Sequence, residues 1–566
     1  MNSHHDDARQ PRRRAIALAA AALAAACAGP AGAFEFETGK DDVQVRWDNT
    51  FRYNYGRRVD AQNALTIANP NWDDGDRNFA KGSSVTNRLD ILSEFDAVFQ
   101  RRHGVRLSAA GWYDQAYAGG FDNTSVATSN RLVNGRPGLG LSPYADRWFH
   151  GPSGEILDAF VFGGFDIGDI AVNLRAGQHT VNWGEALLGG GAIHGIAYAQ
   201  APLDQAKALA TPGIEAKELY RPLPQLSATV QATPELSFAG QYYFGWDATR
   251  LPESGTYLAA QDPLLRGADS LVLAPGPTAA TRAPHGTDVT PRDRGDWGLA
   301  ARWSPEWLDG TVGLYWRNFS DKLPQLNLIA TAPRSYFFSY GSDIDMYGVS
   351  LAKNLGGVSF GLDLNYRRNM PLLSEQAVVT AATRPGEGET GGARGSTWHG
   401  VFNAVGILGK TPLYDSAAVA GELTWNRWNS VSQGANLFKG RDTYRVAGIP
   451  GEPIDKVTKN YWGLAVNFTP TWLQVFPGAD LSLPLSYSAG LKGNSAVSSG
   501  GNEGTGSWSA GLGLDLYNRY RFDLRLVDYF GKATPNAAGT AYSVFNGTQA
   551  GMTDRRFIAF TFKTTL

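Results

Sequence analysis

The sequence predicts an all-β fold: a transmembrane antiparallel β-barrel of about 18 strands, with 16 as the fallback. Three observations lead to it. Apolar and polar residues alternate along segment after segment, and the stretches between these segments are alternately short and long. The chain also ends on an amphipathic segment with no tail behind it. This arrangement predicts long extracellular loops and short periplasmic turns.

Residues 555–566 form the last predicted strand. Counting back from Leu566 by twos gives a mainly apolar set, and the interleaved residues are smaller and more polar apart from Phe557. Side chains alternate across a strand, so one face is apolar. At the end of a soluble domain this strand would be an exposed edge, whereas in a closed barrel it pairs with the first strand and faces lipid. We expect it to pair with residues 43–55.

The same alternation recurs at 43–55, 358–368 and 508–517. One face of each segment is apolar with aromatic residues near its ends, and the other carries ions and amides. This pattern is typical of strands that face lipid outside and water inside. A soluble sandwich would show shorter strands with fewer aromatic residues at their ends.

The gaps between the predicted strands support an even strand count. Long gaps such as 56–86 and 118–154 alternate with short ones such as 101–103 and 167–168. Both chain ends then lie on the periplasmic side. Residues 334–353 are interpreted as one long strand, although Gly341-Ser342 would also allow a split.

Composition agrees with a barrel. Charged residues are 18%, aromatic residues 12%, and there are 67 Gly. Aromatic residues suit membrane interfaces, and glycine suits turns and loops. The mean hydropathy of −0.27 does not indicate a helical membrane protein. The net charge of −2 provides no electrostatic basis for binding nucleic acid.

Residues 1–33 are interpreted as a cleaved secretory signal peptide. Three arginines at 12–14 precede an apolar run at 15–26 and a small-residue site at 31–33. Cys27, the only cysteine, lies inside this leader, so the mature chain 34–566 contains no thiol. A lipoprotein signal is the alternative, but the residues before Cys27 lack the usual leucine.

The connection at 185–220 is predicted to fold into the barrel and to constrict or plug the pore. Three glycines at 189–191 precede a short predicted helix at 202–210, and the stretch is less polar than the other loops. A wide barrel needs an element that restricts passage. An ordinary extracellular loop with a helical turn is the alternative.

Candidate pore-lining or constriction residues come from this connection, its flanks and the polar faces of predicted strands. On the preceding strand Ile170, Val172 and Leu174 share one parity, and the other parity faces the lumen. The candidates are Arg175, His179, Asn182, Trp183, Glu185, Asp204, Lys217, Asp363 and Arg367.

The motif Asn-Trp-Gly-Glu at 182–185 and the stretches 212–219 and 222–227 carry a family resemblance. They resemble segments of proteobacterial outer-membrane proteins catalogued as domain of unknown function 1302. The resemblance covers nearly all of the mature chain and implies a Gram-negative envelope barrel. Members of that family are often encoded near exporters of the RND type and near genes for hydrophobic-compound metabolism. The family has no agreed substrate or catalytic residues.

The sequence indicates no enzyme, no cofactor and no metal site. The pattern G-x-S-x-G at 357–361 lies inside an alternating strand, whereas a hydrolase elbow needs a strand-to-helix turn. The histidines are scattered without the spacing of metal ligands. Residues 73–76, Asp-Asp-Gly-Asp, are interpreted as a solvated acidic turn, with a Ca²⁺ site as the alternative.

The leading hypothesis for function is an outer-membrane channel for passive or facilitated diffusion of small solutes. It rests on the mixed charges of the predicted inner face, which favour small polar solutes. One alternative is a transporter of hydrophobic compounds, for uptake or for export alongside an RND-type system. Another is a structural or adhesive barrel without transport, indicated only by the long loops.

Expected partners follow from the location. They are outer-membrane lipid and lipopolysaccharide, the insertion machinery acting on the C-terminal strand that ends at Leu566, and an envelope exporter. No nucleic acid is expected. The solute, the direction of transport, the gating and the oligomeric state are not indicated by the sequence.

Overall fold

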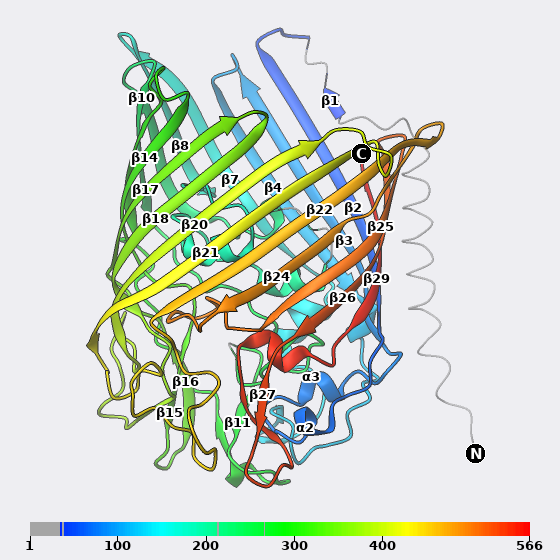
Figure 1. Ribbon diagram of the computed structural model, residues 1–566, viewed down its shortest axis with the longest axis vertical. Helices are drawn as coiled ribbons and strands as arrows, with labels where there is room; N and C mark the ends of the chain where they lie inside the picture. The colour runs from blue at the N-terminus through cyan, green and yellow to red at the C-terminus, as the bar shows by residue number, and fades with distance from the viewer. Residues whose placement is uncertain (1–33, 37–38, 212–213, 215, 265) are drawn as a thin grey trace.

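The computed structural model describes residues 34–566 except 37–38, 212–213, 215 and 265, so the predicted leader lies outside the described residues. Within the described part, eighteen antiparallel strands form one closed barrel (Figure 1). The hydrogen-bonded sheet has twenty strands because β1 (Phe34–Phe36) adds to β2 and one barrel strand is broken into two pieces. The predicted count of about eighteen is confirmed.

The barrel strands follow one another around the ring in chain order, each paired with the next. They are β2 (Val43–Arg58), β3 (Ser84–Phe99), β4 (His103–Asp114), β7 (Ser153–Ile167), β8 (Ile170–His179), β9 (Leu223–Gln231), β10 (Leu236–Tyr243), β13 (Trp297–Trp303), β14 (Gly310–Phe319), β17 (Ile344–Leu355), β18 (Val358–Pro371), β20 (Arg394–Leu408), β21 (Ser416–Gln433), β22 (Asn460–Phe476), β23 with β24 (Ala479–Ser482 and Leu485–Lys492), β25 (Gly506–Leu516), β26 (Tyr520–Phe530) and β29 (Phe557–Thr565).

The C-terminal strand closes the ring as predicted. β29 pairs with β2 in the register Thr50↔Thr565 to Arg58↔Phe557, and with β26 on its other side. Both neighbours are antiparallel, so no strand of the ring presents an open edge. The alternating segment predicted at the C-terminus is therefore the strand at which the barrel closes.

Alternation separates an apolar outer face from a polar inner face. On β18, Leu362 and Leu364 are 42% and 37% exposed, whereas the intervening Asp363 and the following Asn365 are fully buried. Large apolar side chains are exposed in the same way on many other strands, including Ile156, Leu299, Leu314, Phe402 and Leu512. Contact of such an apolar surface with water would be unfavourable, whereas contact with lipid is favourable. No helix among the described residues is long and apolar enough to cross a membrane.

Long and short connections lie at opposite ends of the barrel (Figure 1). Turns such as 100–102, 168–169 and 356–357 lie at the end that also holds the C-terminus, and the long loops cover the other end. In outer-membrane barrels the long-loop end is extracellular and the short-turn end is periplasmic.

The prediction of one strand across 334–353 is wrong. The structure contains β16 (Ser335–Ser339) and β17 (Ile344–Leu355), and only β17 belongs to the barrel. β16 pairs with β15 (Gln325–Ile329) in the loop layer, where Tyr336 and Phe338 are buried. Between the two strands the chain turns at Asp343, whose φ is +55°. The alternation of 335–339 therefore reflects packing among loops, and Gly341-Ser342 marks the split.

The barrel strand between β22 and β25 is interrupted at Leu483-Pro484, which separates β23 from β24. Proline lacks the N–H that the ladder requires, so the pairing with β22 shifts across it. Both pieces still lie between β22 and β25, and together they occupy one place in the ring.

The long loops pack into a layer with its own buried clusters. Its elements are β5 (Leu132–Val133) with β6 (Arg136–Pro137), β11 (Ser270–Val272) with β12 (Arg282–Pro284), β15 with β16 and β19 (Ala377–Val379), β27 (Ala533–Pro535) with β28 (Tyr542–Phe545), and the short helices α2 (Ala64–Ile67), α3 (Asp74–Arg77) and α4 (Pro143–Ala145).

The acidic stretch 73–76 lies inside this layer, so the prediction of a solvated turn is wrong. Asp73 and Asp76 are fully buried and Asp74 is nearly so. The carboxylate of Asp74 accepts the backbone N–H of Asn130 at 2.8 Å, and Asp76 forms an ion pair of 2.6 Å with Arg58. Loops from distant parts of the chain cover the turn and bind it. Within the described residues no group of His, Cys, Asp or Glu side chains is arranged to hold a metal ion.

Candidate functional site

The connection between β8 and β9 is bound by side chains from the inner faces of the barrel strands. It contains α5 (Gly189–His194), α6 (Gln205–Ala210) and a 3-10 turn at Ala216–Glu218. Residues 182–221 are called the in-folded segment below. In Figure 1 short helices are visible between the strands at mid-height of the barrel.

The carboxylate of Glu422 on β21 holds the start of α5. Its Oε2 accepts the backbone N–H groups of Leu187 and Leu188 at 2.8 and 2.9 Å, and its Oε1 accepts that of Gly191 at 2.7 Å. The first N–H groups of a helix have no partner within the helix, so this carboxylate satisfies them from outside. A negative charge at a helix N-terminus is also favourable.

Asp363 on β18 binds the backbone on both sides of the same helix. Its Oδ1 accepts the N–H of Glu185 at 2.9 Å, and its Oδ2 accepts that of Ile196 at 3.1 Å. The chain can approach this closely because residue 184 is glycine. Gly184 has a φ of +85°, and a Cβ there would lie 2.5 Å from Oδ2 of Asp363.

Guanidinium groups bind the carbonyl groups of the same stretch. Arg367 on β18 donates to the carbonyl oxygen of Ile193 at 2.9 Å. Arg317 on β14 donates to the carbonyl oxygens of Ile196 and Tyr198 at 2.8 and 2.7 Å. The inner wall therefore offers acceptors to the N–H groups and donors to the carbonyls, and both cations are fully buried. Such charge-assisted bonds are stronger than neutral ones.

Apolar contacts complete the attachment of the first half. Trp183 is 4% exposed and belongs to a buried cluster with Ile196 of the segment and Tyr315, Phe319 and Met346 of the wall. The Trp183 and Tyr315 rings lie 6.0 Å apart. Burial of these rings adds hydrophobic stabilisation to the polar contacts.

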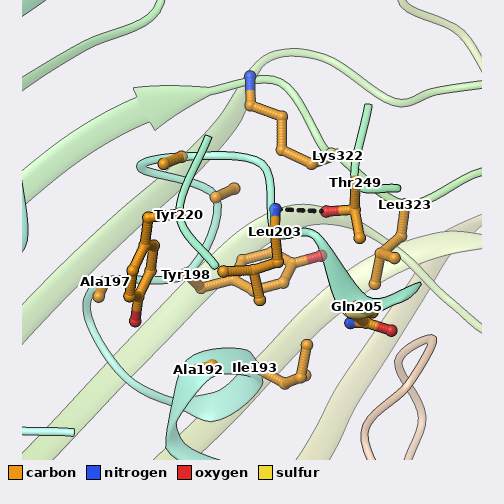
Figure 2. A pocket seen from close by; sticks show the side chains of 12 residues that line it. Ala192, Ile193, Ala197, Tyr198, Leu203, Gln205, Tyr220, Thr249, Lys322 and Leu323 are labelled. Carbon is orange, nitrogen blue, oxygen red and sulfur yellow. Dashed lines mark hydrogen bonds between the residues drawn. The ribbon is translucent and has the colours of Figure 1, made fainter. Parts of the chain in front are cut away.

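The packing leaves little space beside this cluster. A cavity of about 10 Å³ beside it has room for about one water molecule. Figure 2 shows Ala192, Ile193 and Tyr198 among the residues that line it. At its edge the N–H of Leu203 donates to Oγ1 of Thr249 at 3.3 Å, which joins the in-folded segment to a long loop.

Helix α6 is favoured by its own sequence and is also bound by a residue outside the in-folded segment. Asp204 is its N-cap residue, and the carboxylate accepts the N–H of Lys207 at 2.9 Å. Alanines at 206, 208 and 210 favour the helix. The same carboxylate forms an ion pair with Arg250 of a long loop, and Arg250 also pairs with Glu155 of β7 at 2.9 Å.

The second half of the segment binds the wall at β2 and β3. Glu218 forms a buried two-point ion pair with Arg52 of β2, one of its contacts being 3.0 Å. Lys217 forms an ion pair of 2.6 Å with Glu94 of β3. In the ring of eighteen strands β18 lies nine strands from β3, on the opposite wall. The in-folded segment therefore reaches from one side of the lumen to the other.

The structure divides the predicted candidates into groups. Trp183, Glu185, Asp363 and Arg367 meet at the β14–β18 wall. Asp204 and Lys217 take part in the ion pairs beside β7 and β3.

The remaining candidates stay apart from these contacts. His179 is bonded within the wall, to Oγ of Ser227 at 2.7 Å. The guanidinium of Arg175 lies 5.9 Å from the ring centre of Phe160, and Asn182 is exposed.

A family model described as "Protein of unknown function (DUF1302)" matches residues 14–566. The chain belongs to this family. No curated protein matches it. Among solved structures it is similar to Pseudomonas aeruginosa OpdK with vanillate (10% identity, 92% of this chain and 98% of that chain, TM-score 0.37). Others are Acinetobacter baumannii OccAB2 (10%, 95% and 99%, TM-score 0.41) and the outer membrane channel DcaP of Acinetobacter baumannii (10%, 95% and 100%, TM-score 0.35).

Several residues that bind the in-folded segment of this DUF1302 protein were not among the predicted candidates. Glu422, Arg317 and Asn403 lie on inner faces, and Asn403 donates to the carbonyl oxygen of Glu185 at 2.5 Å. The period-2 pattern places each of them on a polar face. It does not distinguish a side chain that faces water from one that holds backbone.

His194 and His399 were also missed as a pair. Their Nδ1 atoms lie 2.9 Å apart, between α5 and β20, and both rings are fully buried. Burial lowers the pKa of His194 to about 4, although its hydrogen bond to the Gly500 carbonyl acts in the other direction. They are 205 residues apart in sequence, and no local signal connects them.

Proposed function

We propose that this DUF1302 protein is a channel of a Gram-negative outer membrane through which small solutes diffuse, passively or with facilitation. In this proposal the in-folded segment is the constriction of the channel. One observation carries it: charged side chains on two opposite inner walls bind the segment across the lumen.

The nature of these contacts favours a constriction over simple filling of the interior. A barrel is held together by its hydrogen-bonded ladder and needs no interior segment for closure. Here buried charges on the strands are matched to backbone groups of the segment, as Glu422 and Arg317 illustrate. Unpaired charges at these positions would be costly, so the wall and the segment are complementary.

Ion pairs line the lumen at the short-turn end. Arg521 of β26 lies 2.9 Å from Asp523 and 3.7 Å from Asp515 of β25, and both Arg521 and Asp515 are about 40% exposed at the side chain. Opposed charges of this kind favour small polar solutes over long apolar ones in a water-filled passage. A solute on the periplasmic side would meet these charged side chains on the wall of the lumen.

Planar-bilayer recording of the refolded full-length protein tests the proposal. We expect discrete single-channel conductance for the natural chain and a larger conductance for a variant without residues 189–210. The matched control lacks residues 381–387, an exposed stretch of the long loop between β18 and β20, and should conduct like the natural chain. No conductance from either the natural chain or the 189–210 deletion would contradict a channel and leave a structural or adhesive role.

A further inference from the structure

Two adjoining cavities lie between α6 and the barrel wall at the long-loop end. Their volumes are about 30 and 20 Å³, and six residues border both of them. The shared residues are Val85, Thr86, Tyr117, Phe149, Ala206 and Ala210. The two spaces are therefore neighbouring parts of one gap beside the in-folded segment.

Aromatic rings form the walls of this gap. Trp112 of β4 stacks on Trp148 of a long loop, with ring centres 5.4 Å apart and an interplanar angle of 23°. Tyr117 lies 5.9 Å from Phe149 between the two cavities. Phe557 borders the smaller cavity. Flat aromatic walls bind other flat rings by stacking and edge contacts.

Every cation that borders the gap has a carboxylate partner. Arg88 pairs with Asp90 at 2.8 Å, Lys207 pairs with Glu218 at 3.5 Å, and Arg250 pairs with Asp204 and Glu155.

The acidic Asp114 is also satisfied, since it accepts bonds of 2.8 Å from Oγ1 of Thr86 and the N–H of Asn87. An ionic ligand would lose its hydration here without finding an uncompensated charge, and burial of an unpaired charge is costly. The gap therefore favours neutral molecules.

The residues of α6 that border the gap are two alanines and Lys207, which borders only the larger cavity. Ala206 and Ala210 are four residues apart and lie on one side of the helix, and both border the two cavities. Ala208 borders neither. Small side chains opposite large rings leave space that interlocking side chains would fill, and this is the origin of the cavities.

We propose that this gap is a binding site for small neutral aromatic molecules, and that they are solutes of the channel. The inference rests on the proposed function and adds to it a substrate class and a binding site. The two cavities, of about 20 and 30 Å³, hold only a few water molecules, whereas a buried benzene ring occupies a cavity of about 150 Å³. Binding therefore requires α6 to move away from the Tyr117–Phe149 wall, which links occupancy of the site to movement of the in-folded segment.

Benzyl alcohol is the neutral aromatic probe, and benzoate and cyclohexanol are its charged and non-aromatic counterparts. Saturation-transfer NMR on refolded full-length protein reports binding of each. We expect transfer to benzyl alcohol that exceeds transfer to the other two. An Ala206→Leu/Ala210→Leu variant fills the gap and should weaken the affinity about tenfold or more.

Two further variants separate the site from general effects of substitution. Ala208→Leu places the same side chain on the same helix away from the gap and should bind like the natural chain. Phe149→Ala removes one ring of the aromatic wall and should bind benzyl alcohol more weakly, although the gap becomes larger. Equal transfer in all four proteins, or binding of benzoate as strong as that of benzyl alcohol, would overturn the proposal.

Conductance of the same preparations distinguishes the two proposals. A natural chain that conducts ions but shows no selective transfer to benzyl alcohol refutes the aromatic site and leaves the channel. A natural chain that binds benzyl alcohol selectively but never conducts refutes the channel. Heat-dependent gel migration of each variant verifies that the barrel is folded, so loss of binding in a folded Ala206→Leu/Ala210→Leu variant counts as support.

Discussion

The Nδ1 atoms of His194 and His399 lie 2.9 Å apart, and their other contacts determine the tautomer of both rings. Nε2 of His194 donates to the carbonyl of Gly500 at 2.8 Å, so its Nδ1 accepts. His399 therefore donates through Nδ1, and its Nε2 accepts the hydroxyl of Thr397 at 2.8 Å. The arrangement needs two neutral imidazoles. It joins α5, β20 and the long loop that contains Gly500.

Lowering the pH should break the contact between His194 and His399. Burial lowers the pKa of His194 from its usual 6.5 to about 4, so protons bind more readily once the ring is exposed. A lowered pKa means that the contribution to docking is complete above about pH 6.5 and is lost as the pH falls toward 4. The loss corresponds to about 3 kcal/mol. Arg367 would also repel the charged ring.

Single-channel conductance recorded from pH 7.5 to pH 4 measures the effect, and we expect it to rise with acid in the natural chain. In His194→Gln the rise should be reduced. His103→Gln, at the short-turn end, is the control and should keep the natural profile. An acid response that is the same in all three proteins would contradict a role for the histidine pair.

Removal of the Glu422 carboxylate should loosen the start of α5. Glu422→Ala leaves three N–H groups without their charged acceptor, and each such bond contributes about 1.5–3 kcal/mol. A loss of about 3 kcal/mol, the contribution of only one or two of these bonds, would raise the population of undocked states roughly a hundredfold. Conductance and current noise should both increase. Glu306→Ala removes an exposed carboxylate from the short turn between β13 and β14 and should change neither, which makes it the matched control.

The buried turn 73–76 should make the long-loop layer more stable in mild acid. Burial, with the charge of Asp74, raises the pKa of Asp73 to about 7, and burial raises that of Asp74 as well. A raised carboxylate pKa means that the stabilisation is complete below about pH 4 and is lost as the pH rises through 7.

Hydrogen exchange of amides in this turn, corrected for intrinsic rates, should therefore be slower at pH 5 than at pH 8. In Asp73→Asn the difference should shrink because one of the two coupled charges is absent. Asp442→Asn, at an exposed position, should behave as the natural chain does. Faster corrected exchange at pH 5 would have the wrong sign for this explanation.

Loss of residues 562–566 should prevent assembly of the barrel. These residues pair with β2 from Thr50 to Tyr53, and without them both β2 and β26 keep open edges. The variant should be missing from the outer-membrane fraction and should not show the heat-dependent gel migration of folded barrels. A deletion of the same length at 536–540, in the hairpin between β27 and β28, should assemble. Assembly of both variants would show that closure does not need this strand end.

Local sequence determined most of the barrel. Alternation has a period of two residues, and the number of exposed apolar positions on β18 or β29 can be counted directly from the chain. Connection lengths then determine which end each loop occupies. Alternation is misleading at 334–353 because β16 also alternates, although its two faces pack among loops and not between lipid and lumen.

The candidate site was predictable only in outline. The composition of 185–220 separated it from the solvent-exposed loops, and parity placed Asp363 and Arg367 on an inner face. Neither feature identifies Glu422 as the partner of α5, because that contact joins residues more than two hundred positions apart. Parity also treats Arg175 and Arg367 alike, yet one is exposed and the other is fully buried.

The sequence by itself determined that this chain closes into a barrel with an apolar exterior, since both properties depend on the order of neighbouring residues. Only the tertiary structure decided what the polar interior does. Strands on opposite walls bring Glu422, Arg317 and Arg52 to one segment, and which charges meet backbone there depends on ring closure. Ring closure is a property of all eighteen strands together, so no local pattern records it.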